Sequence, residues 1–165
     1  KALPLVWHFI GPIQSNKTRA IAESFYWVHS VDRLKIAQRL NDQRPESLPP
    51  LNILLQVNIN EEDSKSGVTL DTLETLASEV NALPRLKLSG LMAIPTATND
   101  SALQRQNFHS LRVARDKLVL AGFTSCTHLS MGMSNDFEAA IAEGATMIRI
   151  GTDIFGPRIP ARDRL

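Results

Sequence analysis

The stretch that decides the fold is Ser130–Gly156, SMGMSNDFEAAIAEGATMIRIGTDIFG. It predicts a strand end, a glycine turn, a helix, a second strand and a second glycine turn. We expect Ser134 to be the N-cap of the helix and Gly132 to let the backbone approach a ligand. Gly151 and Thr152 repeat the pattern after the second strand. Two such turns are typical of the phosphate site that barrel enzymes build after their last two strands.

A helix cap or a turn glycine also has a purely structural use, so Ser134 and Gly151 alone do not establish a phosphate site. Arg149 is the additional signal. It lies in the apolar strand predicted at Thr146–Ile150, where burying a guanidinium is costly unless the charge has a partner or a function. The combination predicts a ligand that has both a phosphate and a polar ring.

The composition is that of an ordinary globular chain, with 165 residues, 43% hydrophobic residues and a net charge of +1. This charge gives no electrostatic reason to expect nucleic acid or an acidic membrane surface as a partner. No apolar run approaches the roughly 20 residues of a membrane span. Cys126 is the single cysteine, and we expect a buried small residue rather than a nucleophile. We therefore expect a cytoplasmic protein, and we assign no metal ligand and no catalytic residue.

Strands and helices are predicted to alternate along the whole chain. The six strands are expected at Leu5–Ile10, Phe25–Ser30, Leu51–Ile59, Leu86–Ile94, Phe123–Leu129 and Thr146–Ile150. The helices are expected at Lys17–Ser24 with Ser15 and Asn16 as caps, from the cap Asp32 through Leu40, and at Leu70–Leu83, Ser101–Leu120 and Ser134–Glu143.

This alternation specifies an α/β fold with a parallel sheet. A doubly wound sheet is one option, but its Gly-x-Gly-x-x-Gly turn after an early strand is absent from the sequence. The other option is part of a (β/α)8 TIM-type barrel, for which about 250 residues are typical. We expect residues 1–156 to form this partial barrel and residues 157–165 to form an irregular C-terminal tail.

Five spaced motifs together resemble the pyridoxal phosphate homeostasis proteins, the YggS/PROSC family. They are His8–Lys17 (HFIGPIQSNK), Ser64–Gly67 (SKSG), Gly90–Pro95 (GLMAIP), Ser130–Asp136 (SMGMSND) and Arg149–Gly156 (RIGTDIFG). The resemblance implies the (β/α)8 fold of the alanine racemase N-terminal domain. It also implies a non-catalytic carrier that buffers or delivers intracellular pyridoxal 5′-phosphate, with the cofactor and pyridoxal-phosphate-dependent apo-enzymes as partners.

The resemblance places the cofactor at the C-terminal mouth of the barrel. Ser134, Gly151 and Thr152 would hold its phosphate, and Arg149 would face the pyridine nitrogen. Ile10 and Met92 would pack against the ring, although strand ends in barrels are apolar in any case, so an ordinary core role stays open. His8 is expected to be a hydrogen-bonded core histidine.

The chain resembles strands three to eight of the family's barrel. We therefore expect an N-terminally truncated piece, because the family's cofactor lysine lies on the first strand, in a segment that precedes Lys1. Lys65 is the remaining amine of interest, and we expect it to be a solvated lysine beside acidic neighbours, which favour its protonated form.

Two other functions stay open at this point. One is a racemase or decarboxylase of the same fold, which requires a further acid–base group and usually an additional β domain. The other is a truncated scaffold that binds phosphate or nothing and self-associates through open sheet edges. The family is mostly monomeric, so association would be a consequence of truncation.

Overall fold

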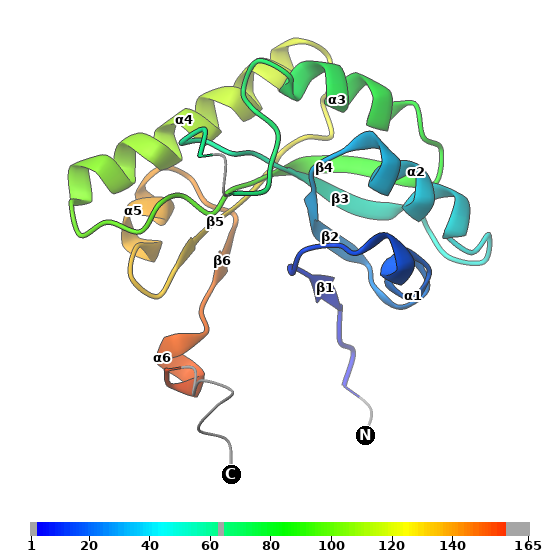
Figure 1. The fold of residues 1–165 in the computed structure, drawn as a ribbon, viewed down its shortest axis with the longest axis horizontal. Helices are drawn as coiled ribbons and strands as arrows, with labels where there is room; N and C mark the ends of the chain where they lie inside the picture. Colours follow the sequence, from blue (N-terminus) through cyan, green and yellow to red (C-terminus); the bar gives the residue numbers. More distant parts are fainter. Residues whose placement is uncertain (1–2, 63–64, 158–165) are drawn as a thin grey trace.

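The computed structural model describes residues 3–62 and 65–157. Strands and helices alternate along this chain (Figure 1). In order, the elements are β1 (His8–Phe9), the 3-10 helix η1 (Ser15–Lys17), α1 (Thr18–Ser24), β2 (Trp27–Val31), α2 (Leu34–Gln43), β3 (Leu51–Gln56), α3 (Leu73–Asn81), β4 (Leu86–Met92), α4 (Ser101–Leu120), β5 (His128–Met133), α5 (Phe137–Ala142), β6 (Met147–Arg149) and α6 (Thr152–Phe155).

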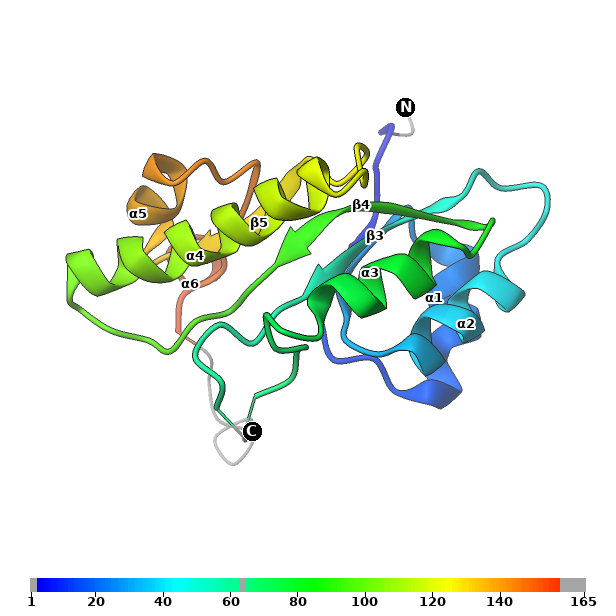
Figure 2. The ribbon, with the colours of Figure 1, turned by 90° about the horizontal axis from the view of Figure 1, so that it is seen from above.

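The six strands form one parallel sheet in the order β1-β2-β3-β4-β5-β6, so each strand is bonded to the next along the chain. A doubly wound sheet would reverse its strand order at a switch point, and this one does not. The sheet is curled, with α1–α5 on its convex side and the edge strands β1 and β6 bordering the open side (Figures 1 and 2). The prediction of a partial (β/α)8 barrel is confirmed.

The apolar core lies between the sheet and its helices. Alternate strand residues point outward into this layer, and helices α2–α4 contribute apolar side chains from their inner faces. Fully or almost fully buried members include Val28, Ile36, Leu40, Ile53, Leu55, Leu88, Leu91, Phe108, Leu111 and Leu129. The opposite, concave face carries hydrogen-bonded polar side chains, among them His8, His29, Ser130 and Arg149. The two faces of one sheet therefore have different chemistry.

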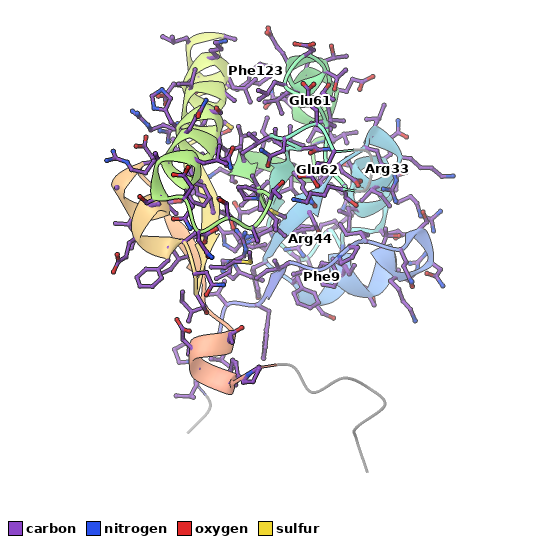
Figure 3. The ribbon with its side chains drawn as sticks, turned by 60° about the vertical axis from the view of Figure 1, so that its left-hand side comes forward. Phe9, Arg33, Arg44, Glu61, Glu62 and Phe123 are labelled. Carbon is purple, nitrogen blue, oxygen red and sulfur yellow. The ribbon has the colours of Figure 1, made fainter. Side chains whose placement is uncertain are left out.

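Arg44 directly follows α2 and connects the end of α1 with the loop before β3 (Arg44 is labelled in Figure 3). It is only 3% exposed, and its guanidinium donates to the carbonyls of Ala22 (2.6 Å), Phe25 (2.8 Å) and Pro49 (2.9 Å). Burial lowers the pKa of Arg44. Three carbonyl partners compensate for the desolvation of the charge. Arg44 thus fixes the loop after α2 against the end of α1.

The helix α4 has the predicted bounds, and the side chain of Asp100 caps it by accepting from the amides of Ala102 (2.9 Å) and Leu103 (3.2 Å). The caps predicted for α1, α2 and α5 are wrong. No side-chain cap bond begins α1, α2 or α5, so Ser15, Asn16, Asp32 and Ser134 are not N-caps.

The fifth strand begins later than predicted. Residues 123–127 form turns, because the Phe123 amide bonds back to Leu118 and the Cys126 amide bonds to Phe123. Cys126 is fully buried as predicted, although in this turn rather than in a strand. Burial raises the pKa of its thiol to about 12, which disfavours the nucleophilic thiolate.

Of the expected irregular tail 157–165, residues 158–165 lie outside the described residues. Within residues 3–62 and 65–157, no helix is both long and apolar enough to cross a membrane.

Candidate functional site

Arg149 lies at the C-terminal end of β6, on the concave face of the sheet. Its guanidinium donates from Nη1 to Ser130 Oγ (2.8 Å) and from Nη2 to the carbonyl of Ala93 (2.9 Å). Burial lowers the pKa of Arg149 to about 10, and the charge of Asp136 acts in the opposite direction. Among the residues that the structure describes, no carboxylate forms an ion pair with Arg149. Arg149 is half-buried, and a cation in such a place without a counter-ion among the described residues favours an electron-rich ligand.

From Ser130, the partner of Arg149, side-chain hydrogen bonds continue across the concave face to the first two strands. Ser130 Oγ lies 2.8 Å from His29 Nδ1, and His29 Nε2 lies 2.9 Å from His8 Nδ1. Burial lowers the pKa of His29 to about 3, with further lowering by the charges of His8, Arg149 and His128. His29 is therefore neutral at physiological pH. His8 is hydrogen-bonded as predicted, but it is half-buried on the concave face rather than a core histidine. His29 and Ser130 were missed.

The two glycine turns meet at the same end of the sheet. Ser134 follows β5, and its hydroxyl accepts from the amide of Asp153 at 3.4 Å. This contact brings Ser134 next to the turn that begins α6, where Gly151 precedes the exposed Thr152. A Cβ added at Gly151 would have no atom within 4 Å. The backbone there is therefore open to a ligand.

Gly132 has a different use from the predicted one. Its φ is +90°, and an added Cβ would lie 2.6 Å from Ala140 Cβ and 3.1 Å from Phe137 Cα. Such contacts are too short for carbon atoms. Gly132 therefore permits close packing of α5 against β5 rather than the approach of a ligand. Asp136 also contributes to this turn, because its carboxylate accepts from the amide of Met133 at 2.6 Å.

The two predicted ring contacts occupy different environments. Met92 ends β4, is fully buried, and is the register partner of Ser130 on β5. Ile10 follows β1 and is 38% exposed. Met92 is thus on the strand next to the Arg149–Ser130 contact, and Ile10 offers apolar surface at the opposite edge strand.

Lys65 is held by the loops that follow β3 and β4. Its ammonium lies 3.3 Å from a carboxylate oxygen of Glu62 (labelled in Figure 3) and donates to Thr96 Oγ1 at 3.0 Å. The predicted acidic neighbour of Lys65 is therefore Glu62, and the ammonium is engaged by this carboxylate and by Thr96. Within the described residues, no hydrogen bond links Lys65 to the other predicted site residues.

A surface hollow of about 480 Å³ lies beside Ser134, between α4 and α5. Ser134 lines it together with Arg105, Asp136 and Glu138. Because Glu143 already engages Arg105, the two carboxylates disfavour a phosphate there. Across residues 3–62 and 65–157, no group of three or more His, Cys, Asp or Glu side chains is placed to hold a metal ion.

Comparison with known proteins assigns the family. The family described as alanine racemase, N-terminal domain, matches residues 5–159. The chain therefore belongs to the alanine racemase N-terminal domain family. Its relatives in that family include two proteins named pyridoxal phosphate homeostasis protein. The one from Pseudomonas aeruginosa is 61% identical over 156 residues, which are 94% of this chain and 66% of the relative. The one from Escherichia coli K12 is 55% identical over 154 residues, 93% of this chain and 65% of the relative.

A solved structure agrees with this assignment. The structure of PipY from Synechococcus elongatus with PLP bound is 35% identical, with a TM-score of 0.82 over 92% of this chain and 71% of PipY. The chain spans about two thirds of the length of the two curated relatives.

Proposed function

We propose that this protein binds pyridoxal 5′-phosphate without turning over a substrate and takes part in intracellular homeostasis of the cofactor. The observation that carries the proposal is the half-buried guanidinium of Arg149, which has no ion-pair partner among the described residues and lies two residues before the open turn at Gly151. The names of the relatives and the PLP-bound structure of PipY support it.

The residues of this chain fit the chemical groups of the cofactor. Ser134 and Thr152 supply hydroxyls and Gly151 supplies an open backbone, which together suit a phosphate. Arg149 suits the pyridine nitrogen, and Met92 and Ile10 offer apolar contacts for the ring.

When bound, pyridoxal phosphate supplies an aldehyde and an electron-withdrawing ring. Arg149 as the partner of the ring nitrogen keeps that nitrogen unprotonated and so weakens electron withdrawal, which suits a carrier.

The described titratable groups also favour a carrier over an enzyme. An efficient general acid or base has a pKa near the working pH. The pKa of His29 is lowered to about 3, and Lys65 is engaged by Glu62. His29 is therefore not suited to move a proton at neutral pH.

We further propose that residues 1–156 act as one partial-barrel domain and that the protein works in the cytoplasm. Pyridoxal-phosphate-dependent apo-enzymes would then receive the cofactor. With a single cysteine, this chain forms no internal disulfide, so its fold does not need an oxidising compartment.

Titration with pyridoxal phosphate, followed by absorbance and calorimetry, tests the proposal. Ser134→Ala with Thr152→Ala is expected to weaken binding about tenfold or more, since two hydroxyl partners of an anion are lost. Arg149→Glu is expected to shift the absorbance band of the bound cofactor. The matched control is Thr72→Ala, an exposed threonine whose hydroxyl, within the described part of the chain, bonds to Thr69. Unchanged affinity in the double variant and an unchanged spectrum in Arg149→Glu would contradict the assignment.

A further inference from the structure

Four side chains cross the whole concave face from one edge strand to the other. Arg149 on β6 contacts Ser130 on β5 (2.8 Å), Ser130 contacts His29 on β2 (2.8 Å), and His29 contacts His8 on β1 (2.9 Å). β2 and β5 are not neighbours in the sheet, since β3 and β4 lie between them. The curl of the sheet therefore brings His29 and Ser130 together across the interior (Figure 1).

The chemistry of Arg149 sets the direction of these hydrogen bonds. A guanidinium only donates, so Ser130 Oγ must accept from it. Ser130 is fully buried, and a buried hydroxyl proton needs an acceptor. Among the described residues, the further partner of this oxygen is His29 Nδ1. His29 Nδ1 is then unprotonated, so the proton of its neutral ring lies on Nε2 and is donated to His8 Nδ1.

We propose that Arg149, Ser130, His29 and His8 form a one-directional hydrogen-bond relay in which Ser130 and His29 are positioning residues for Arg149. Each member donates to the next in that order, and both histidines are neutral with the proton on Nε2. The relay fixes the guanidinium at the end of β6 and joins the two edge strands of the sheet. Its effect on cofactor binding rests on the proposed function, but the relay itself does not.

The charges around His29 agree with this arrangement. His8 faces it from β1, His128 from β5 and Arg149 from β6, and all three disfavour a positive charge on its ring. His29 is also 2% exposed. A doubly protonated His29 would direct an N–H of Nδ1 at Ser130 Oγ, which would leave the serine proton without its acceptor. Burial and geometry therefore select the same neutral tautomer.

Nitrogen NMR of the histidine rings in the ligand-free chain tests the relay directly. At pH 7, His29 and His8 are expected to show an unprotonated Nδ1 and a protonated Nε2, and His29 is expected to keep this state down to about pH 4. A proton on His29 Nδ1, or a charged His29 at pH 6, would overturn the relay.

Ser130→Ala removes the middle member. The expected result is a mixture of two His29 tautomers, because the donor to Nδ1 is lost. The matched control is Ser89→Ala, which removes another buried strand serine, 1% exposed and bonded to Asn52. If both variants leave the His29 signals as in the parent chain, Ser130 does not set the tautomer and the relay is wrong.

Pyridoxal phosphate titration of the same variants tests the positioning of Arg149. Ser130→Ala is expected to bind about tenfold more weakly than Ser89→Ala, since a released guanidinium must be ordered again on binding. Equal affinities would overturn the positioning role. If the parent chain shows the expected tautomers but does not bind the cofactor, the relay stands and the proposed function fails.

Discussion

Replacing Gly132 with alanine is expected to destabilise the fold by detaching α5 from β5. Two separate costs arise at this position. The φ of +90° is unfavourable for any residue with a Cβ. In addition, the new Cβ would lie 2.6 Å from Ala140 Cβ, a contact that forces the helix outward.

The magnitude follows from these two costs. A left-handed conformation costs alanine about 1–2 kcal/mol, and overpacking a close contact costs about 1–3 kcal/mol. We expect a loss of about 3 kcal/mol in the free energy of unfolding. For a chain of this size that corresponds to a fall of about 6–12 °C in the melting temperature.

Alanine substitutions at two other glycines distinguish the cost of the left-handed conformation from the cost of the close contact. Gly122 has a φ of +104° but no atom within 4 Å of an added Cβ, so Gly122→Ala reports the conformational cost alone. Gly151 has a φ of −121° and equally open surroundings, so Gly151→Ala should be close to neutral. Urea unfolding followed by circular dichroism should therefore rank the three variants with Gly151→Ala most stable and Gly132→Ala least stable.

A compensating change tests the contact itself. Ala140→Gly removes the methyl group that the new Cβ would meet, at a helix cost of about 1 kcal/mol. In a double-mutant cycle with Gly132→Ala, we expect a favourable coupling energy of about 1–2 kcal/mol. Additive effects, or a Gly132→Ala variant as stable as Gly122→Ala, would refute the packing role of Gly132.

Three further results are expected. Arg44→Met should cost about 2–4 kcal/mol, since three buried carbonyls lose their donor; Arg19→Met, with a side chain 69% exposed, is the control and should be neutral in the same urea titration. The pKa of Glu143 is lowered chiefly by its hydrogen bond from Arg105, so Glu143 should stabilise the fold above about pH 5 and lose that contribution as pH falls through its folded pKa. In Glu143→Gln, the urea midpoint should fall less steeply between pH 5 and 3 than in the parent chain. An equally steep fall of the urea midpoint in both proteins would contradict this. Cys126 should resist thiol reagents at pH 8 until urea unfolds the chain, and prompt labelling of the folded chain would contradict its burial.

The fold was predictable because its main signals are local. The bounds predicted for α4, Ser101–Leu120, match the structure, and the alternation of strands with helices determines a parallel sheet. The helix starts were less predictable, since several polar residues near each start are able to cap. At α5 the sequence offers Ser134 and Asp136 within three residues, and the helix begins after Asp136 because its carboxylate closes the turn on Met133.

The site was predictable only where a residue is unusual in its own strand. Arg149 stands out in an apolar strand, and the structure places it on the concave face in contact with Ser130. His29 does not stand out, because its partner Ser130 is 101 residues away and meets it only through the curl of the sheet. The alternation of β2 was an available signal, since it puts Trp27 and His29 on one face and the buried Val28 on the other.

The same alternation separates stability from binding along β5. Leu129 and Met131 belong to the core beneath the helices, whereas Ser130 between them points to the concave face and contacts Arg149 and His29. A change at Leu129 or Met131 leaves a cavity in the core and should cost about 2–5 kcal/mol when the side chain is cut back to alanine. Ser130→Ala removes a single oxygen, so its main effect should fall on the direction of Arg149 and on the tautomer of His29. The proposed binding face of this sheet is therefore open to change while the other face maintains the fold.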